Sequence, residues 1–268
     1  MGLFDVHAHM THPALASRAT EVLSNARAAG LTTILANGLN PHDNEAVAAL
    51  AAAEPIVKPC FGLYPVDAVL AEMEAMGQSY PRDPGPPFTM DEAIEWVRDH
   101  VDEAFAIGEI GLDAYWVPEA LLPRQEEAFR RMVQIALDAD KAMIIHTRKR
   151  EARAFAILEE MGATRVNWHC FGGRVKLART IAARGHFLSI PANARRNEAF
   201  TRMLETLPRE RVLLETDCPY LGPDKGIENE PANVVRTLEY ASELWGCSVE
   251  VAQQQLEANF ETLFGVAP

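Results

Sequence analysis

The chain has 268 residues, of which 48% are hydrophobic and 24% charged, a composition typical of a globular protein with a large buried core. It excludes a disordered chain and a small disulfide scaffold. With 25 basic and 38 acidic residues the formal net charge is −13, which argues against a nucleic-acid interface spread over the whole surface but leaves room for a local cationic phosphate site.

The N-terminus carries no targeting signal that we recognise. No basic segment or apolar stretch precedes Asp5, and Val6 stands where a myristoylation signal requires Ser or Thr. No run of about 18 apolar residues predicts a membrane span. The four cysteines lie far apart without a C-x-x-C pair, so we expect reduced thiols and a cytoplasmic protein that does not associate with membranes.

Short apolar runs alternate with amphipathic stretches along the whole chain. The expected strands cover residues 3–9, 32–36, 56–62, 105–111, 142–146, 165–169, 187–190 and 212–215. The expected helices cover residues 17–29, 45–53, 91–103, 123–140, 152–161, 175–184 and 198–207, and the tail 229–263 adds one or two more.

This alternation predicts a parallel sheet, and eight strand–helix units are the number that closes a (β/α)8 TIM barrel. We expect one barrel domain over residues 1–268, with the proline-rich segment 77–88 as an insertion at the rim after the third strand. An open doubly wound sheet is the alternative. It has less support because neither glycine-rich nucleotide-binding motif occurs.

The first expected strand ends in two histidines. Asp5, His7 and His9 alternate along it, so their side chains share the face that points into the barrel. Two imidazoles there can bind one metal ion, although two hydrogen-bonded structural histidines would give the same pattern.

Four further polar residues stand at the carboxyl ends of other expected strands: Glu109, His146, His169 and Asp217. Barrel enzymes place their chemistry at this end. A buried carboxylate without a partner is costly, and coordination of a cation offsets that cost. Four imidazoles and two carboxylates suit Zn²⁺, Mn²⁺ or a related divalent ion such as Mg²⁺.

Six ligands are too many for one tetrahedral site, so we expect two ions with Glu109 bridging them. His7, His9 and Asp217 are assigned to one ion, and His146 and His169 to the other. Water held there would ionise near neutral pH and supply the nucleophile, with Asp217 as proton acceptor; Glu109 and Asp217 are therefore the expected catalytic residues.

The chain resembles the TatD family of metal-dependent deoxyribonucleases, within the amidohydrolase-like barrels. The matching segments are DVHAH (5–9), GEIGLD (108–113), Gln125 with Phe129, HTR (146–148), HCFGG (169–173), LETDCPYL (214–221) and NEP (229–231). The resemblance implies a TIM barrel, a divalent-metal centre on the ligands named above, and hydrolysis of phosphodiesters in DNA.

The chain departs from the family pattern at two positions near the expected site. Tyr64 stands where the family has a histidine, and a phenol donates a hydrogen bond but does not exchange protons readily at pH 7. Glu228 replaces a basic residue before the NEP segment, with Lys225 close by in the same loop. With these differences, an ester other than DNA stays an alternative substrate.

Basic and aromatic residues after the strands are candidates for substrate binding. Arg148 follows a ligand strand and is expected to bind phosphate together with Tyr64 and Lys225. Tyr115 and Trp116 can stack a base or simply pack. Other basic residues either bind phosphate or form a solvated helix face: Lys149, Arg150, Arg153, Arg174 and Lys176.

Three carboxylates are expected to orient the ligand histidines by accepting their second ring N–H: Asp5, Asp113 and Glu215. Cys170 and Cys218 flank ligands but should point to the opposite face and pack.

Three functions agree with these features. The first is a metal-dependent phosphodiesterase acting on DNA. The second is a hydrolase of a small ester, lactone, amide or phosphoester, which the negative charge, Glu228 and Tyr64 favour modestly. The third is a non-catalytic scaffold that keeps metal for stability.

Overall fold

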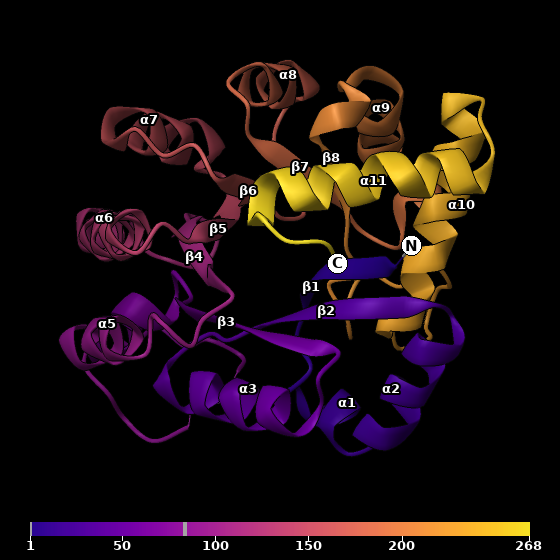
Figure 1. The fold of residues 1–268 in the computed structure, drawn as a ribbon. Coiled ribbons are helices and arrows are strands. Elements are labelled where there is room, and N and C mark those ends of the chain that lie inside the picture. The colour runs from indigo at the N-terminus through magenta and orange to yellow at the C-terminus, as the bar shows by residue number, and fades with distance from the viewer. Residues whose placement is uncertain (1, 83–84) are drawn as a thin grey trace.

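The computed structural model describes residues 2–82 and 85–268, and in them eight parallel strands follow one another around one sheet in chain order (Figure 1). The strands are β1 Leu3–Ala8, β2 Leu31–Asn37, β3 Val57–Leu63, β4 Ala106–Asp113, β5 Ala142–Arg148, β6 Val166–Trp168, β7 Phe187–Ile190 and β8 Val212–Leu214. A parallel bridge between Ala8 and Cys218 joins the first strand to the segment after the last. The predicted TIM barrel is confirmed.

The helices lie outside this sheet and surround it (Figure 1). They are α1 Pro13–Ala16, α2 Ala19–Ala28, α3 Pro41–Ala53, α4 Leu70–Ala75, α5 Met90–Asp99, α6 Leu122–Asp138, α7 Glu151–Met161, α8 Val175–Ala183, α9 Glu198–Thr206, α10 Val234–Trp245 and α11 Val249–Phe264. Short 3-10 turns cover Asp67–Val69 (η1), Glu119–Leu121, Ala194–Arg196, Arg209–Arg211 and Pro231–Asn233. The helices of residues 2–82 and 85–268 include none with the length and apolar character to cross a membrane.

Local sequence explains where several helices begin and end. The Asn40 side chain accepts the Asp43 amide and Pro41 opens α3, so this helix starts four residues before the expected position 45. Thr89 and Glu92 form a capping box at the start of α5. Gly162 ends α7 with a φ of 71°, a conformation that glycine adopts without steric cost.

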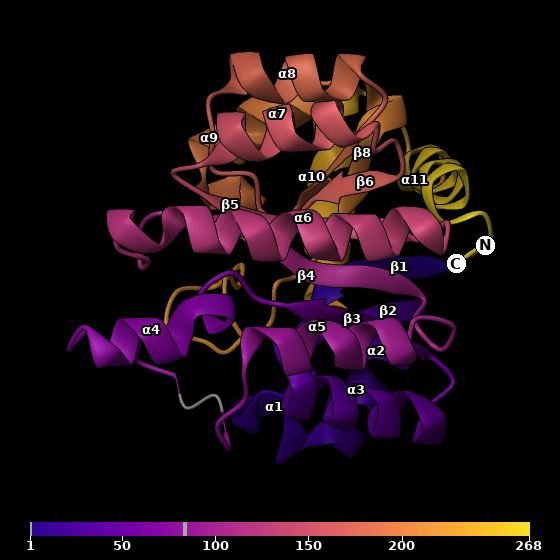
Figure 2. The same cartoon turned by 90° about the vertical axis from the view of Figure 1, so that its left-hand side faces the viewer.

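The structure adds elements to the third strand–helix unit that the sequence pattern did not predict. The turn η1 and the helix α4 follow β3, and the irregular segment 77–88 comes after them. Within that segment residues 83 and 84 lie outside the described part of the chain. Figure 2 shows α4 beyond one end of the barrel, with both chain termini at the opposite end. The expected rim insertion therefore lies on the side of the strands' carboxyl ends.

One glycine lets two strands approach closely next to a candidate ligand. Gly111 in β4 pairs with His146 in β5, and a Cβ at Gly111 would lie 1.8 Å from the carbonyl oxygen of His146. We expect Gly111→Ala to lower the free energy of unfolding by about 2–4 kcal/mol, because one of the two backbones must move. Chemical denaturation of both forms measures this.

Gly185→Ala is the matched control. Gly185 has a φ of 91°, but no described atom beyond its chain neighbours lies within 4 Å of a Cβ built there. An alanine here has the strain of a positive φ but no clash with another strand. It should therefore lower the free energy of unfolding by only about 1–2 kcal/mol. Equal losses in the two variants would show that the close approach of the strands is unimportant.

Candidate metal centre

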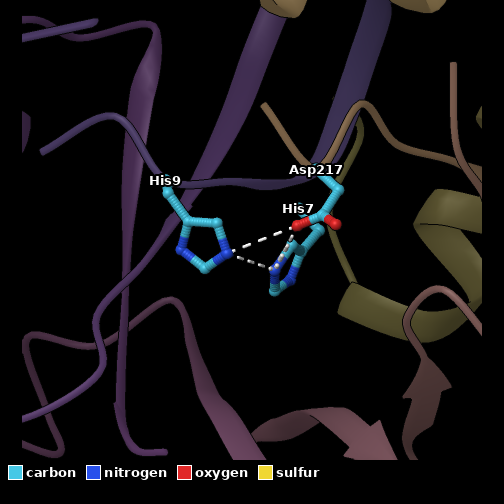
Figure 3. A group of neighbouring side chains, drawn as sticks. All are labelled: His7, His9 and Asp217. Atoms are coloured by element: carbon cyan, nitrogen blue, oxygen red, sulfur yellow. Dashed lines mark hydrogen bonds and ion pairs between the residues drawn. The ribbon is translucent and has the colours of Figure 1, made fainter. Parts of the chain in front are cut away.

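The two histidines at the end of β1 point at the same carboxylate. His7 Nε2 and His9 Nε2 lie 3.3 Å apart, and Asp217 Oδ1 lies 3.6 Å and 3.3 Å from them respectively (Figure 3). All three side chains are buried. Three converging donors of these kinds are the ligand set that zinc and related ions take in proteins, so the residues fit a cation.

Glu109 connects this group to the other two histidines. Its Oε2 lies 3.5 Å from His7 Nε2 and 3.6 Å from His9 Nε2. Its Oε1 lies 2.9 Å from His146 Nδ1 and 3.6 Å from His169 Nε2. Each carboxylate oxygen thus faces a different pair of imidazoles, the arrangement expected of a bridging ligand.

The compact ligand groups differ from the predicted division. The described residues form two: His7, His9 and Asp217, and His7, Glu109 and His169. His7 belongs to both, although the predicted division assigns it to one ion only. His146 belongs to neither, although its ring contacts Glu109. The His7 ring stacks on the His169 ring with centroids 3.7 Å apart, so His7 lies next to a histidine that is predicted for the other ion.

The position of Glu109 depends on small residues around it. A Cβ at Gly62 would lie 2.4 Å from both the amide nitrogen and the carbonyl oxygen of Glu109. The Glu109 amide donates to the carbonyl of Gly38 at 3.1 Å. The glycine of β3 therefore allows the backbone that carries this ligand to lie against the neighbouring strand.

Two of the three expected orienting carboxylates contact a ligand ring. His146 Nε2 donates to Asp113 Oδ2 at 3.2 Å, which leaves its Nδ1 lone pair toward Glu109 and a cation. His169 Nδ1 donates to Glu215 Oε1 at 3.3 Å. Both contacts fix the ring and the nitrogen that faces the centre.

Asp5 does something else. Its carboxylate accepts the Thr216 amide at 2.9 Å and the His7 amide at 3.1 Å, and it also accepts the Thr216 hydroxyl. The expectation that Asp5 holds an imidazole is therefore wrong. It joins the backbone of β1 to the segment that carries Asp217, and burial raises the pKa of its carboxyl to about 8 despite these bonds.

Asp217 lies in the segment that follows β8. Its backbone adopts a φ of 56°, in the left-handed region, which Asp tolerates better than most residues. Its amide donates to the His7 carbonyl at 2.9 Å. Strained backbone held by its surroundings is common at functional sites, and here it turns the carboxylate back toward the histidines.

Burial and neighbouring charge act in opposite directions on the pKa values of Glu109 and His169. Burial alone would raise the pKa of Glu109, but the surrounding imidazoles hold it well below its usual range. Burial alone would lower the pKa of His169, but Glu215, Asp217 and Glu109 raise it to about 10. Burial and the charge of His169 lower the pKa of His7 to about 4. The site without metal therefore holds carboxylates balanced by protonated histidine.

We expect metal binding to release protons. The pKa values of His146 and His169 are raised by their carboxylate neighbours despite burial, and a histidine must be neutral to ligate. Apparent affinity should therefore rise with pH between 6 and 8, about tenfold per pH unit for each proton released. Calorimetric titration with Zn²⁺ in two buffers of different ionisation enthalpy counts the protons. An affinity independent of pH would contradict this.

A cavity of about 700 Å³ opens from the centre to the surface. Five of the six candidate ligands line it, all except the more deeply buried His7, together with two predicted substrate-binding residues, Arg148 and Tyr64. The size matches that of small-molecule sites in general.

The three predicted substrate-binding residues lie in different settings. Arg148 is exposed at the cavity wall, and its guanidinium stacks on the Tyr115 ring at 3.5 Å. Tyr64 is buried, with its ring 4.9 Å from that of His146. Lys225 is exposed in the loop after β8 and does not line the cavity, so its expected role has no support in the structure.

Basic residues after β5 divide into two kinds. Arg150 and Arg153 form ion pairs with Glu126 on α6, and Arg153 also contacts Glu160, so they belong to a solvated helix face. The described chain contains no carboxylate in an ion pair with Arg148. This guanidinium is thus available to an anionic ligand.

A second arginine, which the sequence pattern does not indicate, lies at the cavity. Arg82, in the segment 77–88, lines the cavity and forms an ion pair with the buried Asp67 of η1. Tyr80 and Trp116 line the same wall with ring centroids 5.2 Å apart. The proline-rich composition predicted a rim loop but gave no signal of which side chain would turn inward.

Comparisons with known proteins find similar proteins over nearly the whole chain. The family model described as TatD related DNase matches residues 4–265. The human protein "Deoxyribonuclease TATDN3" is 29% identical over 268 residues, covering 98% of this chain and 95% of that protein. "Uncharacterized metal-dependent hydrolase YcfH" of Escherichia coli strain K12 is 36% identical over 167 residues, covering 60% of this chain and 63% of that protein.

A solved structure supports the fold. The crystal structure of YJJV, a TATD homolog from Escherichia coli K12, superposes with a TM-score of 0.83 at 22% identity and covers 98% of each chain.

Proposed function

The chain belongs to the TatD-related DNase family, and from that premise we propose that it is a divalent-metal-dependent phosphodiesterase that hydrolyses DNA. The observation that carries the proposal is the convergence of His7, His9 and Asp217 on one point, with Glu109 linking them to His169. A purely structural role for these buried donors would not require an open cavity beside them.

We propose that two divalent ions are held by the six residues His7, His9, Glu109, His146, His169 and Asp217. A bound divalent ion would lower the pKa of water and polarise the phosphoryl oxygen. Glu109 presents one oxygen to each side of the centre, which supports two ions rather than one. Zn²⁺, Mn²⁺ and Mg²⁺ are the candidates.

The side chains of this protein then have distinct tasks. The neighbouring histidines hold the pKa of Asp217 below its usual value although burial opposes them, so Asp217 is a carboxylate at pH 7 and can accept the proton of the attacking water. The water oxygen forms a bond to phosphorus as the ester P–O bond breaks, and the departing oxygen takes up the proton that Asp217 accepted from the water. Arg148 can bind the phosphate with two parallel hydrogen bonds.

Tyr64 supplies a different function from a histidine at this position. Burial raises the pKa of its hydroxyl well above the usual value, and nearby Glu109 adds to that effect. At neutral pH the phenol is therefore a hydrogen-bond donor or acceptor and not an acid–base catalyst. It lies beside His146 and limits the cavity at that side.

The second candidate is hydrolysis of a small phosphoester or other ester. The aromatic wall of Tyr64, Tyr80 and Trp116 and the limited cavity volume favour it. A scaffold without activity has no such observation in its favour. A cytoplasmic location stays a prediction from the cysteine spacing.

The test is direct. Metal-loaded protein is incubated with single-stranded DNA, double-stranded DNA and small esters, and kcat/KM values are compared. We expect cleavage of DNA with at least one of Mg²⁺, Mn²⁺ and Zn²⁺. The same preparation of Asp217→Asn excludes contaminating nucleases. Cleavage of small esters alone would move the assignment to the second candidate.

A further inference from the structure

The cavity has a second cationic group on the side formed by the rim insertion. Arg82 lines the cavity and forms an ion pair with Asp67, whose side chain is 0% exposed. Asp67 uses its other oxygen to accept Asn40 Nδ2 at 2.8 Å. Both carboxylate oxygens are therefore engaged, and the guanidinium is held from behind by a fixed partner.

Arg82 is close to the metal centre. Its Cζ lies 5.9 Å from the Tyr64 ring centroid and 5.8 Å from that of Tyr80. The Tyr64 ring in turn lies 4.9 Å from the ring of His146. One aromatic ring, that of Tyr64, thus separates the Arg82 guanidinium from the His146 ring. A substrate bound at the metal centre can therefore reach both groups.

The ion pair with Asp67 leaves most of the guanidinium donors unused. Arginine has five N–H donors in a planar fork, and in the described part of the chain its polar partner is Asp67, through one terminal nitrogen. A guanidinium oriented in this way can bind a phosphate with two hydrogen bonds at little entropic cost. Arg148 supplies the same chemistry elsewhere on the cavity wall, stacked on Tyr115.

We infer that Arg82 binds a second phosphate group of the substrate, next to the phosphodiester that is cleaved, and that Asp67 positions it for this. The preferred substrate is accordingly a short phosphodiester that carries an additional terminal phosphate. The inference rests on the proposed phosphodiesterase function and specifies its substrate. Tyr80 and Trp116, on the same wall, give the intervening group an aromatic surface.

The test compares dinucleotides that share one scissile bond: TpT, 5′-phosphorylated pTpT and 3′-phosphorylated TpTp. Wild-type protein should cleave one phosphorylated form with a kcat/KM at least about tenfold above that for TpT. Arg82→Gln should reduce this preference to less than about threefold, mainly by raising KM for the phosphorylated form. Asp67→Asn, which keeps the size of the side chain, should lower the preference partly.

Arg153→Gln is the matched control, because Arg153 is paired with Glu126 outside the cavity and its loss should leave all three kcat/KM values unchanged. Thermal unfolding of each variant shows that it is folded. Equal cleavage of the three dinucleotides by the wild type, or an equal loss on all three in Arg82→Gln, would overturn the inference and leave the phosphodiesterase function standing. Cleavage of none of them, nor of longer DNA, would overturn both.

Discussion

Replacing Asp217 by asparagine is expected to lower kcat by a factor of about 10² to 10⁴ while the protein stays folded and retains metal. Asparagine keeps a carbonyl oxygen toward His7 and His9 but loses the charge and the ability to accept a proton. It also tolerates the left-handed backbone at this position, where φ is 56°. The loss therefore reports on chemistry and not on folding.

Steady-state kinetics on one substrate, with elemental analysis of the same samples, measures this effect. Asp113→Asn is the informative companion, because Asp113 touches the His146 ring at 3.2 Å but does not line the cavity. It should weaken metal binding about 10- to 100-fold and recover activity at higher metal concentration. An Asp217→Asn protein that regains wild-type kcat when metal is raised would show that Asp217 is a ligand without a proton-transfer role.

The barrel could be predicted because its pattern is repeated eight times along the chain. Each unit has an apolar run followed by an amphipathic stretch, so an error of one or two residues at a boundary does not change the topology. The third unit was the least predictable. Its turn η1 and helix α4 are short, and helices of one or two turns carry little periodicity.

The sequence could predict which polar residues come together at this end of the barrel, but not how they are arranged relative to one another. The carboxyl ends of parallel strands meet at one end of a barrel, so polar residues there come together whatever the details of packing. Which ring stacks on which depends on strand register. The stacking of His7 on His169, which places His7 in both ligand groups, has no signature in the sequence.

Roles that depend on loops were the hardest to predict. Asp5 holds Thr216 and not an imidazole, because the segment after β8 folds back against β1. Lys225 and Arg82 both lie in loops, but of the two only Arg82 forms an ion pair with a buried carboxylate and lines the cavity. Sequence proximity to a ligand motif favoured Lys225, and spatial proximity favours Arg82.

Replacing His169 by glutamine is expected to remove at least half of the bound metal and to reduce activity below detection at low metal concentration. His169 Nε2 faces Glu109 at 3.6 Å, and its Nδ1 is held by Glu215. Glutamine offers no imidazole nitrogen to the ion, so one of the two ligand groups loses a member. Elemental analysis after gel filtration, with the kinetics, measures both losses.

His186→Gln is the control, since His186 is also buried and hydrogen-bonded, accepting Trp168 Nε1 at 3.1 Å, but lies away from the ligand groups. Both variants lose stability, and only His169→Gln should lose metal. Metal at 100 times its Kd stabilises a protein by about 2.7 kcal/mol, so a chelator should lower the Tm of wild type and His186→Gln more than that of His169→Gln. Equal metal contents in the two variants would place the ions elsewhere and remove the basis for assigning catalysis to this end of the barrel.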